Sequence, residues 1–423
     1  MMLAWLLELL VEIMGSAPAL AGELGRNTGL LEAVLSADFF EPMPKADALA
    51  EELNSVLERA GDYQDVLDFT RRWANDRKFQ IGVQMLRHLI GAAEAGNTLT
   101  SVAEVSMRAL YPLVLAEFER LHGPIDGEMA VLALGKLGAQ ELTFQSDLDL
   151  IFLYDSASDA STGPRPLPVS QYFARLGQRY INAISALTAE GRLFEVDMRL
   201  RPSGHAGPIA IALDTFVDYQ KNSAWTWEHM ALTKARCIVA GPALKARVDA
   251  AVADILQAPR SPKYVLGHVA DMRRRLDGEF GTKDIWNIKY VRGGLTDIEF
   301  IVQYLILKTA PALKRLFSPH LGEALESLKA AGAVDAETAD RLKRALALLQ
   351  NVQSYLRLTC PGAFDEATAA RAVKTGLAAH CGASDFETLK ADLSATQTEV
   401  LAIYNRMIDA PDRALQAERP PEK

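Results

Sequence analysis

The sequence is poor in cysteine, and its cysteines show no paired spacing. Cys237, Cys360 and Cys381 form no C-x-x-C arrangement, so we expect neither a zinc site nor a disulfide-stabilised secreted fold. We interpret all three as buried, reduced thiols of a cytoplasmic protein.

Positive charge is also scarce. The 45 lysines and arginines are outnumbered by 54 aspartates and glutamates, which gives a formal net charge of -9, and no block of basic residues stands out. Because binding to a phosphate backbone draws most of its affinity from clustered positive charge, this composition argues against a nucleic-acid partner.

The opening segment of the chain is apolar but too short to cross a membrane. The most apolar segment, MMLAWLLELLVEIMG at residues 1–15, is interrupted by Glu8 and Glu12 and has no basic leader. It also falls short of the ~20 apolar residues that a spanning helix needs. We therefore predict a buried helix and no membrane partner.

The rest of the chain predicts a mostly helical α+β protein. With 423 residues, 49% hydrophobic and 23% charged, it can form two or three domains with sizeable cores. The expected organisation is an N-terminal helical region at 1–125, a mixed sheet with helices at 126–255, a C-terminal helical bundle at 256–410 and a disordered tail at 411–423. The expected central elements are strands 129–134, 147–154, 192–200 and 208–212 and helices near 138–143 and 170–189. Scattered arginines of the first region are expected on solvated faces, namely Arg71, Arg72, Arg77 and Arg87.

Two aspartates alternate within one of these apolar strands. In SDLDLIFLYD, residues 146–155, Asp147 and Asp149 point to one face while Leu148 and Leu150 point to the other. Paired carboxylates in an apolar strand are costly unless a cation lies between them. The pattern therefore predicts a site for a divalent cation, Mg²⁺ or Mn²⁺.

A third acid lies in FEVDMRLRP, residues 194–202, where Asp197, Arg199 and Arg201 share a charged face. An exposed sheet face shows the same alternation. Beside the Asp-Leu-Asp strand, however, we interpret Asp197 as a third carboxylate and the arginines as phosphate contacts. This layout suits metal-assisted nucleotidyl transfer, in which one cation lowers the pKa of the attacking hydroxyl and another steadies the triphosphate and the leaving pyrophosphate.

A glycine turn precedes the acidic strand. Gly135 and Gly138 flank Lys136, whose ammonium and neighbouring N–H groups can hold phosphate oxygens, although a solvent-exposed turn lysine is equally compatible. Ser146 is expected to shape the same turn.

For several other residues, a purely structural role competes with a functional one. Lys234 and Arg236 are placed to face a triphosphate, whereas Trp225 and Trp227 suit the core better than adenine stacking. We assign Asp297 and Glu299 to a helix start, in which Thr296 and Glu299 form a capping box, rather than to the metal site. A second capping box is expected at Ser384 and Glu387.

These motifs resemble a known family. The glycine turn followed by the Asp-x-Asp strand resembles the DNA polymerase β-type nucleotidyltransferase signature. Five runs in order resemble glutamine synthetase adenylyltransferase: GKLGAQEL at 135–142, SDLDLIFLYD at 146–155, RLRPSGHAG at 199–207, DYQKNSAWTWEH at 218–229 and RGGLTDIEFIVQYL at 292–305. Gln145 departs from the family, which more often has a small polar residue there.

The resemblance implies a polymerase β-type sheet and an AMP transfer from ATP to a tyrosine of glutamine synthetase, which regulates nitrogen assimilation. It implies metal ligands at Asp147, Asp149 and Asp197, with Asp197 also a candidate general base. The residues expected to bind ATP are Gly135, Lys136, Gly138, Ser146, Arg199, Arg201 and Lys234. PII signalling protein and glutamine are candidate effectors.

The direction of the reaction rests on two motifs. The full-length family enzyme resembles two tandem halves, of which one removes AMP and the other attaches it, and this chain contains one such unit. TDIEF at 296–300 and WTWEH at 225–229 resemble the attaching half. Two alternatives stay open: phosphorolytic removal of AMP, and a non-catalytic module that senses glutamine or docks PII.

Overall fold

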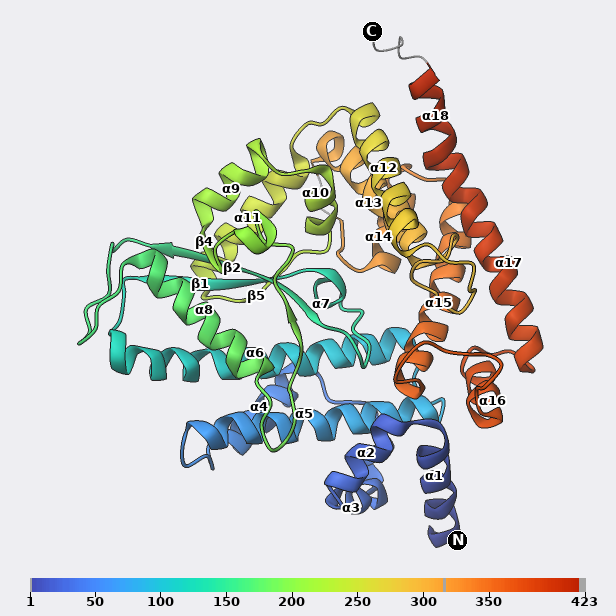
Figure 1. Ribbon diagram of the computed structural model, residues 1–423, viewed down its shortest axis with the longest axis horizontal. Coiled ribbons are helices and arrows are strands. Elements are labelled where there is room, and N and C mark those ends of the chain that lie inside the picture. The colour runs from blue at the N-terminus through green and yellow to red at the C-terminus, as the bar shows by residue number, and fades with distance from the viewer. Residues whose placement is uncertain (1, 315–316, 418–423) are drawn as a thin grey trace.

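The computed structural model describes residues 2–314 and 317–417. A mixed sheet occupies the middle of the molecule, the N-terminal helices lie below it in Figure 1, and the C-terminal helices lie to its right. This arrangement confirms the expected mostly helical α+β class. The strands are β1 (Gly127–Ala133), β2 (Leu148–Ser156), β3 (Val196–Asp197), β4 (Ala210–Ala212) and β5 (Arg236–Val239).

The sheet is built around β1 and β2. These two strands are antiparallel, β5 pairs antiparallel with the other edge of β1, and β3 and β4 both pair parallel with β2. Residues 129–133 of β1 and 150–153 of β2 are fully buried, as expected of central strands covered on both faces. The surrounding helices are α7 (Gly135–Ala139), α8 (Val169–Ser185), α9 (Leu213–Asn222), α10 (Thr226–Leu232) and α11 (Pro242–Gln257).

The strand expected at 192–200 is much shorter than predicted. Only Val196 and Asp197 pair with β2, and Arg201 then bonds back to the carbonyl of Met198, so the chain turns away from the sheet. The expected alternation survives in part, because Phe194, Val196 and Met198 still pack against the core.

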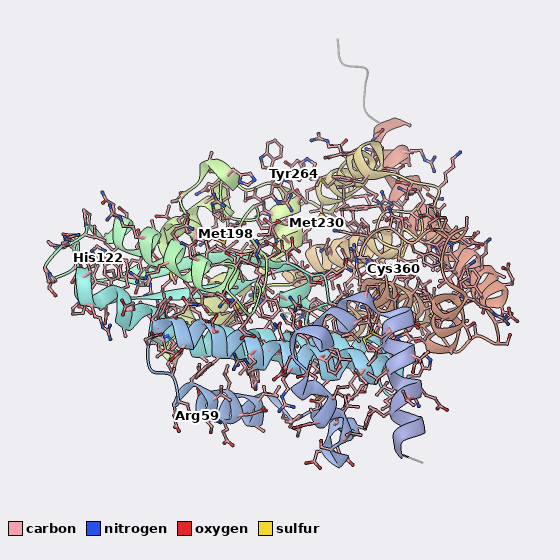
Figure 2. All side chains as sticks on the ribbon, turned by 60° about the horizontal axis from the view of Figure 1, so that its bottom comes forward. Arg59, His122, Met198, Met230, Tyr264 and Cys360 are labelled. Atoms are coloured by element: carbon pink, nitrogen blue, oxygen red, sulfur yellow. The ribbon has the colours of Figure 1, made fainter. Side chains whose placement is uncertain are left out.

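The N-terminal helices form a layer below the sheet. They are α1 (Met2–Ser16), α2 (Pro18–Arg26), α3 (Gly29–Leu35), α4 (Ala46–Leu57), α5 (Tyr63–Leu86) and α6 (Ala92–His122). Among the described residues, α6 alone is long and apolar enough by composition to cross a membrane, but 56% of its apolar window is buried in the protein. It packs against α5 and α8 and is a core helix of the fold. Figure 2 shows its last residue, His122, at one edge of the molecule.

The first helix is not buried all round, which corrects our expectation. Leu9 and Ile13 lie in the core, whereas Leu7, Val11 and Met14 are exposed. The reason is that α1 packs with one face on α2, α5 and α16.

Arg71 of α5 is buried, not solvated as expected. Its guanidinium donates to the carbonyls of Leu67, Ala183, Ala186 and Gly191 at 2.8–3.1 Å. The end of a helix leaves carbonyls without intrahelical partners, and Arg71 satisfies those at the end of α8. Through Arg71, helix α5 thereby holds the segment that leads from α8 to β3.

The C-terminal part is a helical bundle, as expected. Its helices are α12 (Pro262–Phe280), α13 (Leu295–Leu313), α14 (Leu321–Ala330), α15 (Ala336–Thr359), α16 (Arg371–His380), α17 (Phe386–Tyr404) and α18 (Ala410–Ala417). The tail expected to be disordered from residue 411 is helical up to Ala417, because Asp412 is buried in an ion pair with Arg274 of α12. Residues 418–423 of that tail lie outside the described residues.

Both expected capping boxes are wrong. Helix α13 begins after Gly294, and Thr296 donates instead to the carbonyl of Lys289. At α17 the capping residue is Asp385, whose carboxylate accepts the N–H of Thr388. In both places the residue before the helix lies one or two positions from the expected capping residue.

Candidate active site

The three aspartates lie together at the edge where β2 meets β3. Asp149 and Asp197 are paired residues of these parallel strands, and Asp147 lies two residues before Asp149, just outside the start of β2. The amide of Leu148, between Asp147 and Asp149, donates to the carbonyl of Glu195 at 2.9 Å. The sheet register therefore places Asp149 beside Asp197, with Asp147 at the start of the same strand.

The charges of these acids act on one another. The pKa of Asp149 is raised to about 6, first by burial and then by the negative charges of Asp147 and Asp197. The positive charges of Lys289 and Arg199 oppose this increase. Like charges gathered at a half-buried position are the electrostatic signature of a site that favours a cation.

Asp197 is engaged by Arg199. Its Oδ1 accepts the backbone N–H of Arg199 at 2.8 Å and its Oδ2 accepts Nε at 2.7 Å. Burial pushes the pKa of Asp197 up, but these hydrogen bonds outweigh it and leave the pKa below its ordinary value. A carboxylate that stays deprotonated suits a metal ligand better than a general base.

The arrangement fits a divalent cation in its chemistry but is not a closed cage. Among the residues that the structure describes, no three histidine, cysteine, aspartate or glutamate side chains converge closely enough to hold a metal ion. The donors are all carboxylate oxygens, the ligands that Mg²⁺ and Mn²⁺ prefer. Release of Asp197 from Arg199 would free the third carboxylate.

The glycine turn touches the acids directly. Gly135 has a φ of +54°, and a side chain there would overlap Oδ2 of Asp149. Both features require glycine, the first because of the left-handed backbone and the second because of the close approach. At Gly138 a side chain would overlap the carbonyl of Lys234, so this glycine lets α7 pack on the segment before β5.

Ser146 and Gln145 hold the loop before the acids. The Ser146 hydroxyl accepts the N–H of Thr143 at 2.9 Å, which closes the turn. Gln145 donates to the carbonyls of Arg357 and Cys360 and accepts from the Arg357 guanidinium, all at 2.8–2.9 Å. This residue, which departs from the family pattern, therefore ties the loop to the end of α15. Figure 2 marks Met198, next to Asp197, and Cys360.

Lys136 is neither a solvent-exposed turn lysine nor in contact with the aspartates. Its Nζ donates to Oε1 of Gln353 on α15 at 2.9 Å. Burial, followed by the nearby charges of Lys289, Arg357 and Lys234, lowers its pKa to about 8.

Lys234 is buried beneath the site. It donates to Oε1 of Glu299 at 2.9 Å. Burial alone would lower the pKa of Lys234, but the charges of Glu299 and Glu141 outweigh it and raise the pKa. Glu299 thus links α13 to the catalytic sheet, a role that the capping-box interpretation missed.

Three other residues, which the sequence analysis placed in the site or in the core, have different partners or exposure in the structure. Arg201 donates to the carbonyls of Met198, His205 and Gly207 and holds its own loop. Arg236 caps the carbonyls of α7 instead of facing the acids. Trp225, expected in the core, is 64% exposed at the start of α10.

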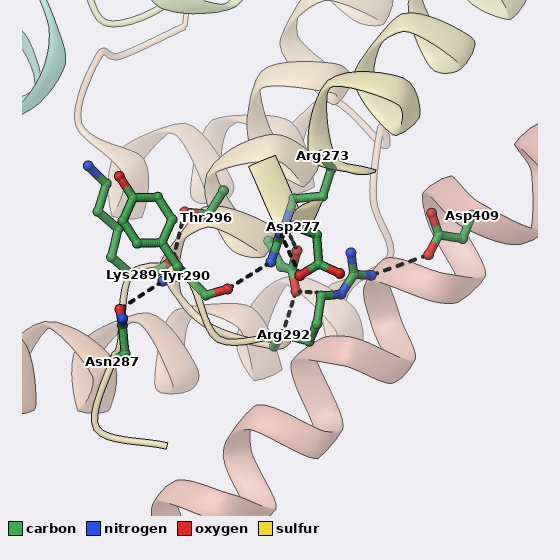
Figure 3. Close-up of polar contacts among 10 residues, drawn as sticks. Arg273, Asp277, Asn287, Lys289, Tyr290, Arg292, Thr296 and Asp409 are labelled. Atoms are coloured by element: carbon green, nitrogen blue, oxygen red, sulfur yellow. Dashed lines mark hydrogen bonds and ion pairs between the residues drawn. The ribbon is translucent and has the colours of Figure 1, made fainter. Parts of the chain in front are cut away.

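Asp297 is structural, as expected, but through buried ion pairs. It is fully buried, and its Oδ1 accepts from Nε of Arg273 at 2.6 Å. Its Oδ2 accepts the N–H of Gly293 and lies 3.7 Å from Nε of Arg292. Figure 3 shows this cluster at the base of the loop between α12 and α13.

Sequence reasoning missed Lys289. This exposed residue of the same loop is near enough to the acids that its charge lowers the pKa of Asp149 and of Glu299. Its only signal in the sequence is its position just before the RGGL motif, which says nothing of its neighbours in space.

Two family models match parts of this chain. Residues 7–251 match the family model of glutamate-ammonia ligase adenylyltransferase, and residues 270–408 match that of GlnD PII-uridylyltransferase.

Three similar relatives are each named bifunctional glutamine synthetase adenylyltransferase/adenylyl-removing enzyme. The chain is 41% identical over 408 residues to that of Xanthobacter autotrophicus, 38% over 407 residues to that of a Bradyrhizobium species and 38% over 410 residues to that of Rhodopseudomonas palustris. Each match covers 96% of this chain but 41% of the relative, so the chain spans about two fifths of their length. Because the first family model covers more than half of the sequence, the chain belongs to the glutamate-ammonia ligase adenylyltransferase family.

Proposed function

We propose that this chain transfers AMP from ATP to a tyrosine of glutamine synthetase and releases pyrophosphate. The observation that carries the proposal is the pairing of Asp149 with Asp197 beside the glycine turn, with the charge of Asp147 close enough to raise the pKa of Asp149. The family membership and the names of the relatives supply the nucleotide and the protein substrate.

The chemistry is an in-line displacement at the α-phosphorus. The tyrosine oxygen forms a new P–O bond, the bond from the α-phosphorus to the bridging oxygen breaks, and pyrophosphate leaves with the electron pair. Asp147, Asp149 and Asp197 would hold Mg²⁺ or Mn²⁺, which when bound lowers the pKa of the hydroxyl and neutralises the triphosphate. Because hydrogen bonds from Arg199 keep the pKa of Asp197 low, this carboxylate is a poor proton acceptor, and the hydroxyl proton passes to solvent.

The remaining predicted residues act around these acids. Gly135, Gly138 and Ser146 shape the turn against the nucleotide, and Arg199 leaves Asp197 to contact phosphate when a cation binds. We assign Lys136, Arg201 and Lys234 to positioning, because their side chains are held by Gln353, by loop carbonyls and by Glu299.

Attachment rather than removal is supported by the TDIEF and WTWEH motifs. Removal remains the second candidate, because the relatives are named for both activities. The match of residues 270–408 to a PII-uridylyltransferase supports the helical bundle as the place where PII or glutamine acts. The free thiols fit a cytoplasmic location.

The test uses the full chain, unmodified glutamine synthetase, Mg²⁺ or Mn²⁺, and ATP labelled at the α-phosphate. We expect labelled tyrosine and equimolar pyrophosphate from the wild type. Asp147→Asn and Asp149→Asn should lose at least ~100-fold of the rate while remaining folded. Asp155→Asn on the same strand is the control and should retain transfer.

Two further outcomes separate the alternatives. ADP formed from adenylylated glutamine synthetase and phosphate, without forward transfer, would assign the chain to removal. Calorimetry that detects no binding of ATP with Mn²⁺ would favour a non-catalytic module. Normal transfer by either aspartate variant would refute the assignment of the acids.

A further inference from the structure

A cleft lies between the loop at 281–294 and the end of α15. Its volume is about 300 Å³, at the lower end of the range for small-ligand pockets. Two exposed cations line it, Lys289 from the loop and Arg357 from α15, together with the buried amide of Gln353, the exposed carboxylate of Asp284 and apolar side chains. With two cations and one acid, the charged groups of the cleft carry a net positive charge.

The loop that carries Lys289 is held at several points. The Tyr290 carbonyl accepts from Arg273 at 3.2 Å, and the Lys289 carbonyl accepts from the Thr296 hydroxyl at 2.6 Å. The buried Trp286 donates to Glu366 at 3.0 Å. In Figure 3 the Lys289 side chain points away from the Asp297 cluster that anchors the loop. The Lys289 amine lies over the ring of Tyr290, 4.9 Å from its centre. A held backbone with an exposed amine is suited to binding, because little order is lost when a ligand arrives.

Two cleft residues form hydrogen bonds to the segments that flank the acids. On one side, Gln353 accepts from Lys136, which follows the glycine that touches Asp149. On the other, Arg357 donates to Gln145, two residues before Asp147. One guanidinium N–H is used in this bond, and the others remain available.

The charges converge on the same place. Lys289 and Arg357 line the cleft, and Lys136 donates to the amide of Gln353 in its wall. Three cations, Lys136, Lys289 and Arg357, thus lie in or next to the cleft. An anion with several charges that reaches from the acids toward α15 would meet this positive field.

We propose that this cleft binds the β- and γ-phosphates of the nucleotide through Lys289 and Arg357 and then holds the pyrophosphate that leaves. The inference rests on the proposed function, since it places the α-phosphorus at the aspartates. The bridging oxygen takes the electron pair when the bond to the α-phosphorus breaks, and the two cations stabilise the charge that develops on pyrophosphate. The helical bundle thereby supplies part of the active site.

The experiment measures binding of inorganic tripolyphosphate and of ATP to the full chain by calorimetry, with Mg²⁺ present. Lys289→Ala should weaken both about tenfold, as expected for loss of one phosphate contact by a cation. Lys289→Arg should restore most of the affinity. Lys283→Ala, in the same exposed loop but outside the cleft, is the matched control and should bind as the wild type does.

Arg357 needs its own control, because it also holds Gln145. Arg357→Ala should weaken tripolyphosphate binding, whereas Gln145→Ala, which removes the hydrogen bonds but leaves the guanidinium, should weaken it less than threefold. Far-UV circular dichroism and thermal melting check that each variant is folded.

The outcomes separate this inference from the proposed function. Tripolyphosphate that does not bind the wild type, or that binds Lys289→Ala equally well, overturns the cleft even if AMP transfer is observed. Binding that depends on Lys289 without modification of glutamine synthetase supports the cleft and instead refutes the protein substrate.

Discussion

Asp149→Asn should stabilise the folded protein while it abolishes activity. The substitution removes one of three negative charges that share the edge of the sheet and leaves an isosteric amide. Burial and the charges of Asp147 and Asp197 raise the pKa of Asp149 from its ordinary 3.8 to about 6. Above pH 6 the folded state must keep this carboxylate charged against those forces, whereas the unfolded chain ionises it freely.

The size of the effect follows from the pKa difference. A change from 3.8 to about 6 corresponds to roughly 3 kcal/mol at 1.36 kcal/mol per unit, and about 2 kcal/mol remains after a discount for partial exposure and screening. The sign follows from linkage: a raised carboxyl pKa favours the folded state below pH 3.8, and this contribution is lost as the pH rises through 6. The advantage of the variant should therefore be full at pH 8 and smaller at pH 5.

The assay is urea denaturation of both proteins at pH 8 and pH 5, with and without Mg²⁺ or Mn²⁺. At pH 8 we expect the variant to unfold at higher urea with an unchanged m-value. Added cation should stabilise the wild type, since a ligand that binds only the folded state raises its stability, and should stabilise the variant much less. Asp155→Asn, which loses an exposed ion pair with Arg247, should change stability by less than about 1 kcal/mol.

The reasoning would be refuted if Asp149→Asn were no more stable than the wild type at pH 8. An equal response of both proteins to the cation would separately refute Asp149 as a metal ligand.

Three other predictions concern buried charge. Arg71→Ala should destabilise the protein by about 3–5 kcal/mol, because at least three carbonyls at the end of α8 and in the segment after it lose a charged donor. Urea denaturation measures this change, and a loss of less than ~1 kcal/mol would show that water replaces the guanidinium. Lys234→Met should lower the free energy of unfolding by about 3–5 kcal/mol, because it leaves Glu299 without its ion-pair partner. The double variant Lys234→Met with Glu299→Met should recover much of this stability, which a double-mutant cycle measures. Burial, followed by the charge of His88, lowers the pKa of His380 to about 4, so stability present above pH 6.5 should fall by up to roughly 3 kcal/mol as the pH drops to 4. His380→Phe should flatten this pH dependence, and an unchanged slope would contradict the burial of a neutral imidazole.

Much of the catalytic sheet could be predicted from local pattern. The alternation of Asp147 and Asp149 with apolar residues predicts a strand. The expected strands at 129–134 and 147–154 and the expected helix at 170–189 end within a few residues of β1, β2 and α8. The short β3 was harder, because pairing with β2 ends after Asp197 and this depends on where the neighbouring strand lies.

Local sequence pattern is enough to predict the mostly helical α+β class, the two-residue spacing of the acids and the glycine turn, because each depends on backbone geometry over a few consecutive residues. The partners of the long charged side chains depend instead on how the helices and the sheet pack. Arg71 is buried, Lys136 reaches Gln353, and Lys289 lies near enough to Asp149, 140 residues earlier in the chain (289 − 149), for its charge to lower the pKa of that acid. A long flexible side chain takes its partner from whatever element packs nearby, and that neighbour is chosen by the burial of the whole core rather than by the residues beside it in sequence.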